Sequence, residues 1–389
     1  MPRRKAKQNG KTPFSLRLQA LRKARKLNME KLAQAVGVSK SFVSLLESGG
    51  RQPSRDVVLE LAKALTPDAT TEGTAFEKLR DELLVLAGFM PVNPAAVQTF
   101  QDTLSLYAKA VAENPTDFRL FSRWVMALIR SGHYEEARQR IDEGMKTFSQ
   151  AAYLCALRAQ LELSQQHYGK ALEQQRQAVI AAEQDSDDSS LDLSDLRFNV
   201  SAILFLMGHQ HMQENPAKAL EYFVSAIEGL EPLLDTADAY VLDEYARLLF
   251  NRAYLTGETA HWEQTIAAYR QVLIHPEKSQ LGVTALKESA AFLAHAYTKM
   301  SDFDAAELTL GLLSAFQQED WLVNYLQACL YTAMAEHTPQ NTDTLLERAL
   351  TALRASHATH PERTRSEALH DPDLNYLRQH KDLFEEINP

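Results

Sequence analysis

Apolar side chains recur every three or four positions along most of this chain, and this spacing places them on one face of an α-helix. The first such segment covers residues 14–26, with apolar positions at Phe14, Leu18 and Leu21. Residues 96–389 follow the same spacing, and no alternation of apolar and polar residues indicates a strand there. The pattern therefore predicts an all-α protein.

Three or four further short helices are expected before residue 66. One covers about 29–36 and the next about 39–48, where two glycines follow as a stop signal. A fourth helix begins near Pro53 and Ser54. The positions expected to face a common core are Leu32, Ala33, Val36, Val38, Val43, Leu46, Val57, Val58, Leu61 and Leu65.

The corner between the second and third of these helices carries specific local signals. Gly37 permits a positive φ, and the hydroxyl of Ser39 can accept from the first free amides of the next helix. In that helix Val43 and Leu46 fall on the side that can be buried. The opposite side carries Lys40, Ser41, Ser44 and Leu45. A short helix with a polar, basic outer face is what the major groove of DNA admits.

These residues belong to a longer motif of about fifty positions. Its members are Arg17, Leu18, Leu21, Arg22, Lys23, Ala24, Arg25, Leu32, Ala33, Gly37, Val38, Ser39, Ser41, Phe42, Val43, Ser44, Leu46, Glu47, Gly50, Arg51, Pro53, Ser54, Leu61, Ala62, Ala64 and Leu65. With this spacing, residues 14–66 resemble the helix-turn-helix DNA-binding domain of the Cro/phage-repressor-like (XRE) family. The resemblance implies a structural ion pair between Arg22 and Glu47. Met29 stands where the family usually has a phosphate-contacting Gln, which puts that contact in doubt.

The resemblance and the helix pattern together predict a set of DNA contacts. The predicted residues are Ser39, Lys40, Ser41, Ser44, Leu45, Arg51 and Arg55. Lys40, Ser41 and Ser44 would read base edges, whereas the two arginines would hold phosphates. Leu45 would touch a thymine methyl group or pack against a partner. Since one small domain reads only a few base pairs, we expect a homodimer on an inverted repeat of double-stranded DNA.

The segments around this domain have a different composition. Residues 1–13 are rich in Arg and Lys and lack an apolar period, which predicts a flexible basic arm. The arm would either add contacts to DNA or serve only solubility. Residues 67–95 contain many helix-breaking residues and predict a linker with one short helix. We therefore assign residues 96–389 to a second domain.

A short motif recurs in residues 96–389, in which an aromatic residue is followed three positions later by a small one. Tyr134 and Ala137 recur 34 positions later as Tyr168 and Ala171. Trp262 with Thr265 and Phe303 with Ala306 repeat this spacing, and a further copy ends at Ala219 with Pro216 in place of the aromatic residue. Each copy lies between two predicted helices, and the period resembles that of the tetratricopeptide repeat (TPR). The resemblance implies a TPR-like α-solenoid closed by C-terminal capping helices.

Charge divides the chain in the same way. Residues 1–66 hold 15 Lys and Arg against 4 Asp and Glu, whereas the remaining residues hold 26 against 47. The net charges are therefore +11 and −21, which give the overall −10. A cationic N-terminal domain on an anionic body indicates that only the first domain meets a polyanion.

An XRE domain followed by a TPR-like solenoid is similar in architecture to the peptide-sensing quorum regulators of the RRNPP type. In that family the concave face of the repeats binds a short linear peptide, and Asn amides clamp its backbone. The resemblance implies peptide contacts at Arg119, Met126, Arg130, Gln160, Asn199, Asn251, Arg252, His295, Asn324 and Tyr325. We therefore expect a transcription regulator that senses a peptide. A protein partner, as in an antitoxin-like repressor or a scaffold, and a small-molecule signal remain alternatives.

Signatures of catalysis are missing from the sequence. We find no Walker A, HExxH, CxxC or GxSxG motif, so we expect neither an enzyme nor a cofactor. Cys155 and Cys329 stand alone in apolar contexts and are expected to be core residues, not metal ligands or a disulfide. No apolar run is long enough to span a membrane, and none follows the basic N-terminus. We therefore expect a cytoplasmic protein without membrane contact.

Overall fold

The computed structural model of the chain describes residues 12–49, 51, 53–66, 74–87, 89, 92, 104–105, 107–184, 192–236, 238–316 and 320–381. Every regular element among them is helical, which confirms the predicted all-α class. The chain forms two compact units, Met1–Pro232 and Leu233–Pro389, and each is described here by itself. The expected basic arm lies outside the described residues except at its end, and so do residues 67–73 of the expected linker.

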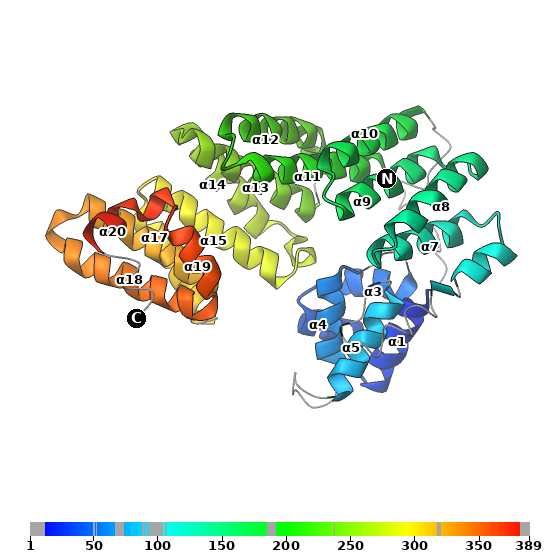
Figure 1. The fold of residues 1–389 in the computed structure, drawn as a ribbon. Coiled ribbons are helices and arrows are strands. Elements are labelled where there is room, and N and C mark those ends of the chain that lie inside the picture. Colours follow the sequence, from blue (N-terminus) through cyan, green and yellow to red (C-terminus); the bar gives the residue numbers. More distant parts are fainter. Residues whose placement is uncertain are drawn as a thin grey trace. The chain divides into compact units, whose positions relative to one another are not determined.

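The first unit begins with five helices, which we call the head (Figure 1). They are α1 (Pro13–Ala24), α2 (Met29–Val36), α3 (Lys40–Ser48), α4 (Arg55–Leu65) and α5 (Thr74–Leu86). The first four start after a capping side chain that accepts a hydrogen bond from the backbone three residues on, and these caps are Thr12, Asn28, Ser39 and Ser54. The helix boundaries therefore follow local side-chain chemistry.

Helix α5 belongs to two hydrophobic cores at once. Phe76, Leu83 and Leu84 complete the core of the head, together with buried residues of α1 to α4. Val85 packs instead into the core of the first repeats, beside Trp124. The helix expected within a linker is thus an integral part of the head, and it joins the head directly to the repeats.

Helical hairpins follow in both units. In the first unit they are built from α7 (Phe118–Arg130), α8 (Tyr134–Thr147), α9 (Ala151–Ser164), α10 (Tyr168–Gln184), α11 (Leu193–His211) and α12 (Pro216–Leu230). In the second they are built from α13 (Ala239–Thr256), α14 (Thr259–Ile274), α15 (Val283–Lys299), α16 (Phe303–Phe316), α17 (Trp321–His337) and α18 (Thr342–Thr359). Short 3-10 helices are η1 (Glu231–Thr236), η2 (Lys278–Gln280) and η3 (Pro339–Asn341).

The recurring small residues lie inside these hairpins. All five are fully buried: Ala137, Ala171, Ala219, Thr265 and Ala306. Each sits in the first turn or the second turn of the second helix of its hairpin, where a larger side chain would push the two helices apart. This burial confirms the interpretation of the motif as a hairpin packing signal.

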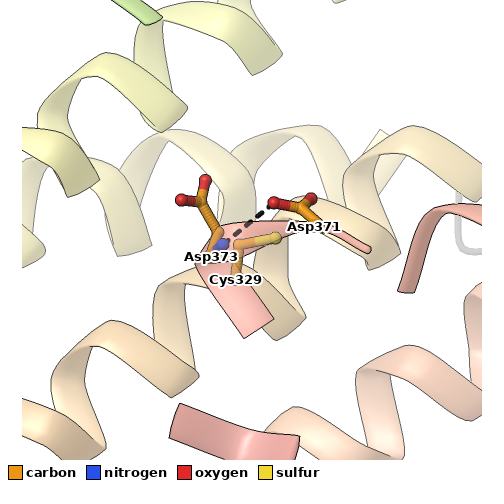
Figure 2. A group of neighbouring side chains, drawn as sticks. All are labelled: Cys329, Asp371 and Asp373. Carbon is orange, nitrogen blue, oxygen red and sulfur yellow. Dashed lines mark hydrogen bonds between the residues drawn. The ribbon is translucent and has the colours of Figure 1, made fainter. Parts of the chain in front are cut away.

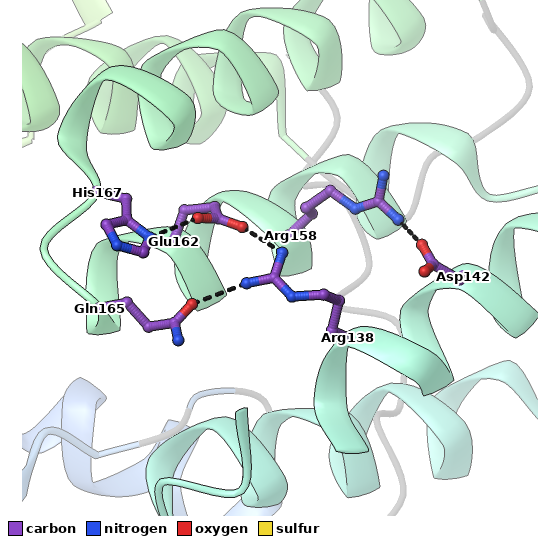
Figure 3. A network of polar contacts seen from close by, with 6 residues as sticks. All are labelled: Arg138, Asp142, Arg158, Glu162, Gln165 and His167. Atoms are coloured by element: carbon purple, nitrogen blue, oxygen red, sulfur yellow. Dashed lines mark hydrogen bonds and ion pairs between the residues drawn. The ribbon is translucent and has the colours of Figure 1, made fainter. Parts of the chain in front are cut away.

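A polar network supports the hairpins of the first unit (Figure 3). Arg138 of α8 donates to Glu162 of α9 at 2.6 Å and to Gln165 at 2.9 Å. His167 lies 2.9 Å from the second oxygen of Glu162, just before α10. Burial alone would raise the pKa of Glu162, but the hydrogen bonds from Arg138 and His167 outweigh it and lower the pKa. The network therefore ties the turn inside the α9–α10 hairpin to α8 of the preceding hairpin through a buried carboxylate.

The second unit ends in the elements α19 (Pro361–Ala368), η4 (Pro372–Leu374) and α20 (Asn375–His380). Leu374 and Leu377 are fully buried in the core that α17 and α18 form. This agrees with the expected cap up to residue 381, and the remainder lies outside the described residues. Within the part of the chain that the structure describes, no helix has the length and apolarity needed to cross a membrane.

Candidate functional site

The turn between α2 and α3 has the geometry that the sequence predicts. Gly37 takes a φ of 74°, in the left-handed region that favours glycine. The hydroxyl of Ser39 accepts a hydrogen bond from the backbone N–H of Phe42 at 3.0 Å. Gly49 ends α3 with a φ of 74°. These three positions fix where α3 begins, where it ends and how it leaves α2.

One side of α3 is held by the head. Phe42, Val43 and Leu46 are buried in the core. Arg22 of α1 donates to both oxygens of the Glu47 carboxylate, at 2.5 and 2.8 Å, and to the carbonyl of Leu27 at 2.9 Å. The hydrogen bond that Arg22 donates to Glu47 raises the pKa of Arg22, although burial opposes it. This bidentate pair locks the orientation of α3 against α1.

The other side of α3 is open. The exposed residues on it are Lys40, Ser41, Ser44 and Leu45, and Leu45 keeps 41% of its surface. Lys40 lies 3.7 Å from the carboxylate of Glu30, but both side chains are mostly exposed. Such a pair is worth little and exchanges readily for another anion. Ser39 differs from its neighbours because its hydroxyl already caps the helix and lies 2.9 Å from that of Ser41.

The two predicted phosphate-binding arginines flank this face. The guanidinium of Arg51 lies 5.2 Å from the centre of the Phe42 ring, so the start of α3 and the segment after it are in contact. Arg55 is exposed at the first position of α4. The structure thus leaves a polar, cationic surface on the head, formed by α3 and the start of α4.

A groove lies along the α17–α18 hairpin in the second unit. Its volume is about 620 Å³, and it is lined by Asn324, Gln327, Tyr331, Thr344, Glu347, Arg348, Thr351, Ala352 and Ala355. Asn324 is only 8% exposed, and no described residue accepts a hydrogen bond from its Nδ2 atom. Gln327 donates to Ser314 at 2.9 Å and Arg348 to Glu307 at 2.6 Å, so the groove lies on the side of the hairpin that faces α16.

Asn324, a predicted peptide contact, lines this groove, whereas Gln327, Tyr331 and Arg348 are not among the predicted residues. The signal was present in the spacing, because positions 324, 327 and 331 recur every three or four residues as polar groups on a largely apolar helix. Such a stripe marks a side of the helix that the core does not cover.

The other predicted peptide contacts do not gather into one place. Arg119, Gln160 and Asn199 are exposed on three different helices of the first unit. In the second unit, Asn251 is buried and donates to the carbonyl of Arg247 within its own helix at 2.7 Å. Arg252 donates to Gln264 of α14. The side chains of Asn251 and Arg252 are therefore already engaged.

Two predicted contacts meet the chain's own C-terminal segment. His295 lies 3.0 Å from the carboxylate of Asp373, and the hydroxyl of Tyr325 donates to Asp371 at 2.9 Å. Both side chains are buried. The expectation that they face an open groove therefore differs from the structure, because residues that follow α19 cover them. Met126 and Arg130 also lie elsewhere than expected, at the junction between the head and the repeats.

Cys329 and the two carboxylates of this segment form a cluster in which the potential ligand atoms lie within 4.8 Å of one another (Figure 2). Asp373 also forms an ion pair with Lys299, and its backbone N–H donates to Asp371 at 2.9 Å. Burial alone would raise the pKa of Asp373, but His295 and Lys299 outweigh it and hold that pKa well below its usual range. Burial raises the pKa of the Cys329 thiol. The chemistry fits a carboxylate network that anchors the C-terminal segment better than it fits a set of vacant metal ligands.

Comparison with protein families agrees with this division. A helix-turn-helix family model matches residues 18–66, and a tetratricopeptide repeat model matches residues 95–161. Both are binding modules and not catalytic domains. No curated protein matches the chain.

Several solved structures align with parts of the chain. The C-terminal part of a TPR repeat-containing protein from Cytophaga hutchinsonii is 12% identical, with 74% of this chain and 97% of that chain covered and a TM-score of 0.45. YrrB, described as a TPR protein with an unusual peptide-binding site, is 17% identical over 56% and 95%, with a TM-score of 0.38. PlcR from Bacillus thuringiensis, solved with the peptide PapR7 and DNA, is 14% identical over 80% and 99%, with a TM-score of 0.29. Scores this low carry no argument about function.

Proposed function

Because the chain joins an XRE-type helix-turn-helix domain to helical repeats of the tetratricopeptide type, we propose that it is a sequence-specific, DNA-binding transcription regulator whose repeats receive a signal. The observation that carries the proposal is the division of α3 into a locked side and an open side. The head would dock the open side into the major groove as a homodimer on an inverted repeat.

The chemistry of the open side suits base readout. Ser41 and Ser44 offer hydroxyls that both donate and accept, and Lys40 offers an ammonium group for acceptors such as those of guanine. The exposed methyl groups of Leu45 suit contact with a thymine methyl. Arg51 and Arg55 would fix the register through phosphates, which carry no sequence information.

Selection from a pool of random duplexes tests the DNA-binding part. The full chain is expected to enrich one motif, whereas the triple variant Lys40→Ala, Ser41→Ala, Ser44→Ala enriches none, because its base contacts are gone. Lys63→Ala is the matched control, since Lys63 is an exposed cation on α4 outside this face. Enrichment of the same motif by the triple variant would refute the assignment of α3.

We propose further that the signal is a short peptide bound in the α17–α18 groove. The groove runs along α18 from Thr344 to Ala355, which is about 16 Å at the rise of an α-helix. An extended segment of about five residues has that length. The amide of Asn324 is buried without a partner, and leaving such a donor unsatisfied costs about 1–3 kcal/mol. A peptide carbonyl would satisfy it.

A displayed library of random linear peptides provides the probe for this groove. The full chain is expected to enrich peptides that the Asn324→Ala variant does not retain. Asn341→Ala is the control, because Asn341 is exposed in η3 outside the groove lining. Peptides retained equally by the Asn324→Ala variant would exclude the groove as their site.

A protein partner is a second candidate for the signal. Leu308 and Leu312 on α16 are 67% and 56% exposed and line a shallow surface hollow with Gly311. Exposed leucines that lie together are typical of a contact with a folded partner. Co-purification from the host separates the two, since a folded protein bound through α16 is released by Leu308→Glu, whereas a groove-bound peptide is not.

A further inference from the structure

A small cavity lies inside the first unit where the head meets the first repeat. It is lined from the head by Thr12, Phe14, Arg51, Pro53, Leu86 and Ala87, and from the repeats by Tyr107, Arg123, Met126, Ala127 and Arg130. Its volume is about 50 Å³. Among the described residues, the lining therefore contains three arginines, one from the head and two from α7, and no acidic side chain.

Arg130 is fixed in this junction by the end of α5. Its Nη1 atom donates to the carbonyl of Ala87 at 2.9 Å, and its guanidinium lies 4.6 Å from the centre of the Phe89 ring. These contacts hold the charge in place but do not neutralise it, because a carbonyl and a ring are both uncharged. Burial lowers the pKa of Arg130, yet an arginine stays protonated in proteins. The positive charge must therefore be balanced from outside the side chain.

The neighbouring groups add to this charge. Among the residues that the structure describes, neither Arg123 nor Arg130 forms an ion pair with a carboxylate. Tyr107 lies close to both, since their charges lower its pKa while burial raises it more strongly. A phenol is neutral near pH 7 and does not compensate a cation. Like charges held around one small space favour the entry of an anion.

The size of the cavity restricts the anion. One water needs roughly 10–15 Å³ of such space, so the cavity holds about four oxygen-sized atoms. This is enough for a single tetrahedral oxyanion and too little for a nucleotide. Guanidinium groups match the oxygens of phosphate in a bidentate geometry. We propose that the junction cavity binds a phosphate dianion, free or as the terminal phosphate of a small metabolite, between Arg51 of the head and Arg123 and Arg130 of α7.

This site goes beyond the proposed function, because Arg123 and Arg130 belong to neither the α3 face nor the α17–α18 groove. Only Arg51 is shared with the proposed DNA contacts of the head. An anion bound there touches both the head and the first repeat. It would stiffen their junction and so favour one orientation of the head on the repeats. Phosphate would then change how the regulator binds DNA, both through the orientation of the head and by engaging Arg51, without occupying the α17–α18 groove.

Phosphorus-31 NMR titration of inorganic phosphate into the full chain, at constant chloride and without DNA, tests the site. Saturable binding is expected for the wild type. The Arg123→Gln variant should bind at least about tenfold more weakly, because it loses a charge-assisted contact. Lys109→Gln removes one exposed cation close to Tyr107 in sequence but outside the cavity, and it should bind like the wild type.

Three controls make the result decisive. Arg130→Lys keeps the charge but loses the fork geometry, so it should also weaken binding, and thermal unfolding shows whether each variant is folded. Methyl phosphate distinguishes free phosphate from the terminal phosphate of a metabolite. If it binds as tightly as inorganic phosphate, the ligand is a phosphorylated metabolite. If it binds more weakly, the ligand is free phosphate. Dimethyl phosphate, which resembles the DNA backbone, should not bind. Equal phosphate binding by the wild type and by Arg123→Gln would overturn the proposal, as would preferred binding of dimethyl phosphate.

Discussion

Helix α3 of the head and helix α17 of the repeats distribute their polar residues in opposite ways. Helix α3 keeps its apolar residues and Glu47 on one side and leaves Lys40, Ser41 and Ser44 exposed on the other. Helix α17 is covered on nearly all sides, so that Tyr325 contacts the C-terminal segment while Asn324 lies at the bottom of a groove. In the head, folding and binding are separated onto two faces. In the repeats, a ligand can contact only those side chains that the neighbouring helices leave accessible.

The largest effect should come from breaking the pair that locks α3. In Arg22→Ala the carboxylate of Glu47, now 2% exposed, would stay buried without its partner. Removing one member of a buried ion pair costs about 3–5 kcal/mol. The head should therefore unfold at a markedly lower temperature, as measured by thermal denaturation of the full chain, while the repeats of the second unit melt as before.

A double replacement sharpens this result. Arg22→Met with Glu47→Leu removes both charges and fills the space with apolar atoms, which is often neutral for stability. It should therefore be much more stable than Arg22→Ala. A double variant as unstable as the single one would mean that the pair itself, and not the stranded charge, holds the head together.

The next effect concerns the segment that covers His295. The Asp373→Asn variant should be less stable than the wild type at pH 7 by about 1.5–3 kcal/mol, since it loses its charge-assisted hydrogen bond from Lys299. The pKa of Asp373 is held below its usual range, so its carboxylate stabilises the fold above the unfolded-state pKa of about 3.9. That contribution is lost as the pH falls further, and the two proteins should converge. Unfolding measured from pH 7 to pH 3 checks this, and a gap that is independent of pH would contradict it.

A similar or smaller loss is expected inside the hairpins. Ala171 is fully buried between α9 and α10, so Ala171→Leu should destabilise the first unit by about 1–3 kcal/mol through overpacking. The adjacent Lys170 is exposed, and Lys170→Leu adds a side chain of the same kind without this conflict. Urea unfolding of both variants separates the two cases. If Ala171→Leu and Lys170→Leu were equally stable, the small side chain of Ala171 would not be needed for packing the two helices.

The smallest effect should come from an ion pair on the surface of the head. Lys63 and Glu60 lie 2.7 Å apart on α4, and each is nearly half exposed. Such pairs contribute about 0–1 kcal/mol. Lys63→Ala should therefore leave the melting temperature of the head almost unchanged, in contrast to Arg22→Ala. A large drop in the melting temperature would show that the solvent exposure of an ion pair does not determine how much it stabilises this domain.

The head could be predicted from the sequence in detail because its signals are local. The positive φ of Gly37 and the cap at Ser39 need only neighbouring residues, and α2 covers the predicted positions 29–36. The motif ending at Ala171 likewise involves two helices that are adjacent in the sequence. Local chemistry therefore fixed the elements and the hairpins.

The ligand contacts of the repeats could not be predicted in the same way. The helical period says which residues share a face, but it does not say which distant segment covers that face. His295 contacts Asp373, which lies far along the chain, and Arg130 contacts the end of α5. Asn324 stays open only because no residue of α16 or α18 reaches its amide. Tertiary packing therefore determines which of the predicted side chains are covered and which stay accessible.

The salt dependence of binding to a selected duplex tests the central claim most directly. If the open side of α3 and its flanking arginines meet DNA, the logarithm of the affinity should fall linearly with the logarithm of the salt concentration. The triple variant Lys40→Ala, Ser41→Ala, Ser44→Ala should bind that duplex no better than random DNA, with a slope shallower by about 0.9 if Lys40 contacts a phosphate in addition to a base. An affinity that ignores salt and is unchanged in the triple variant would contradict the account.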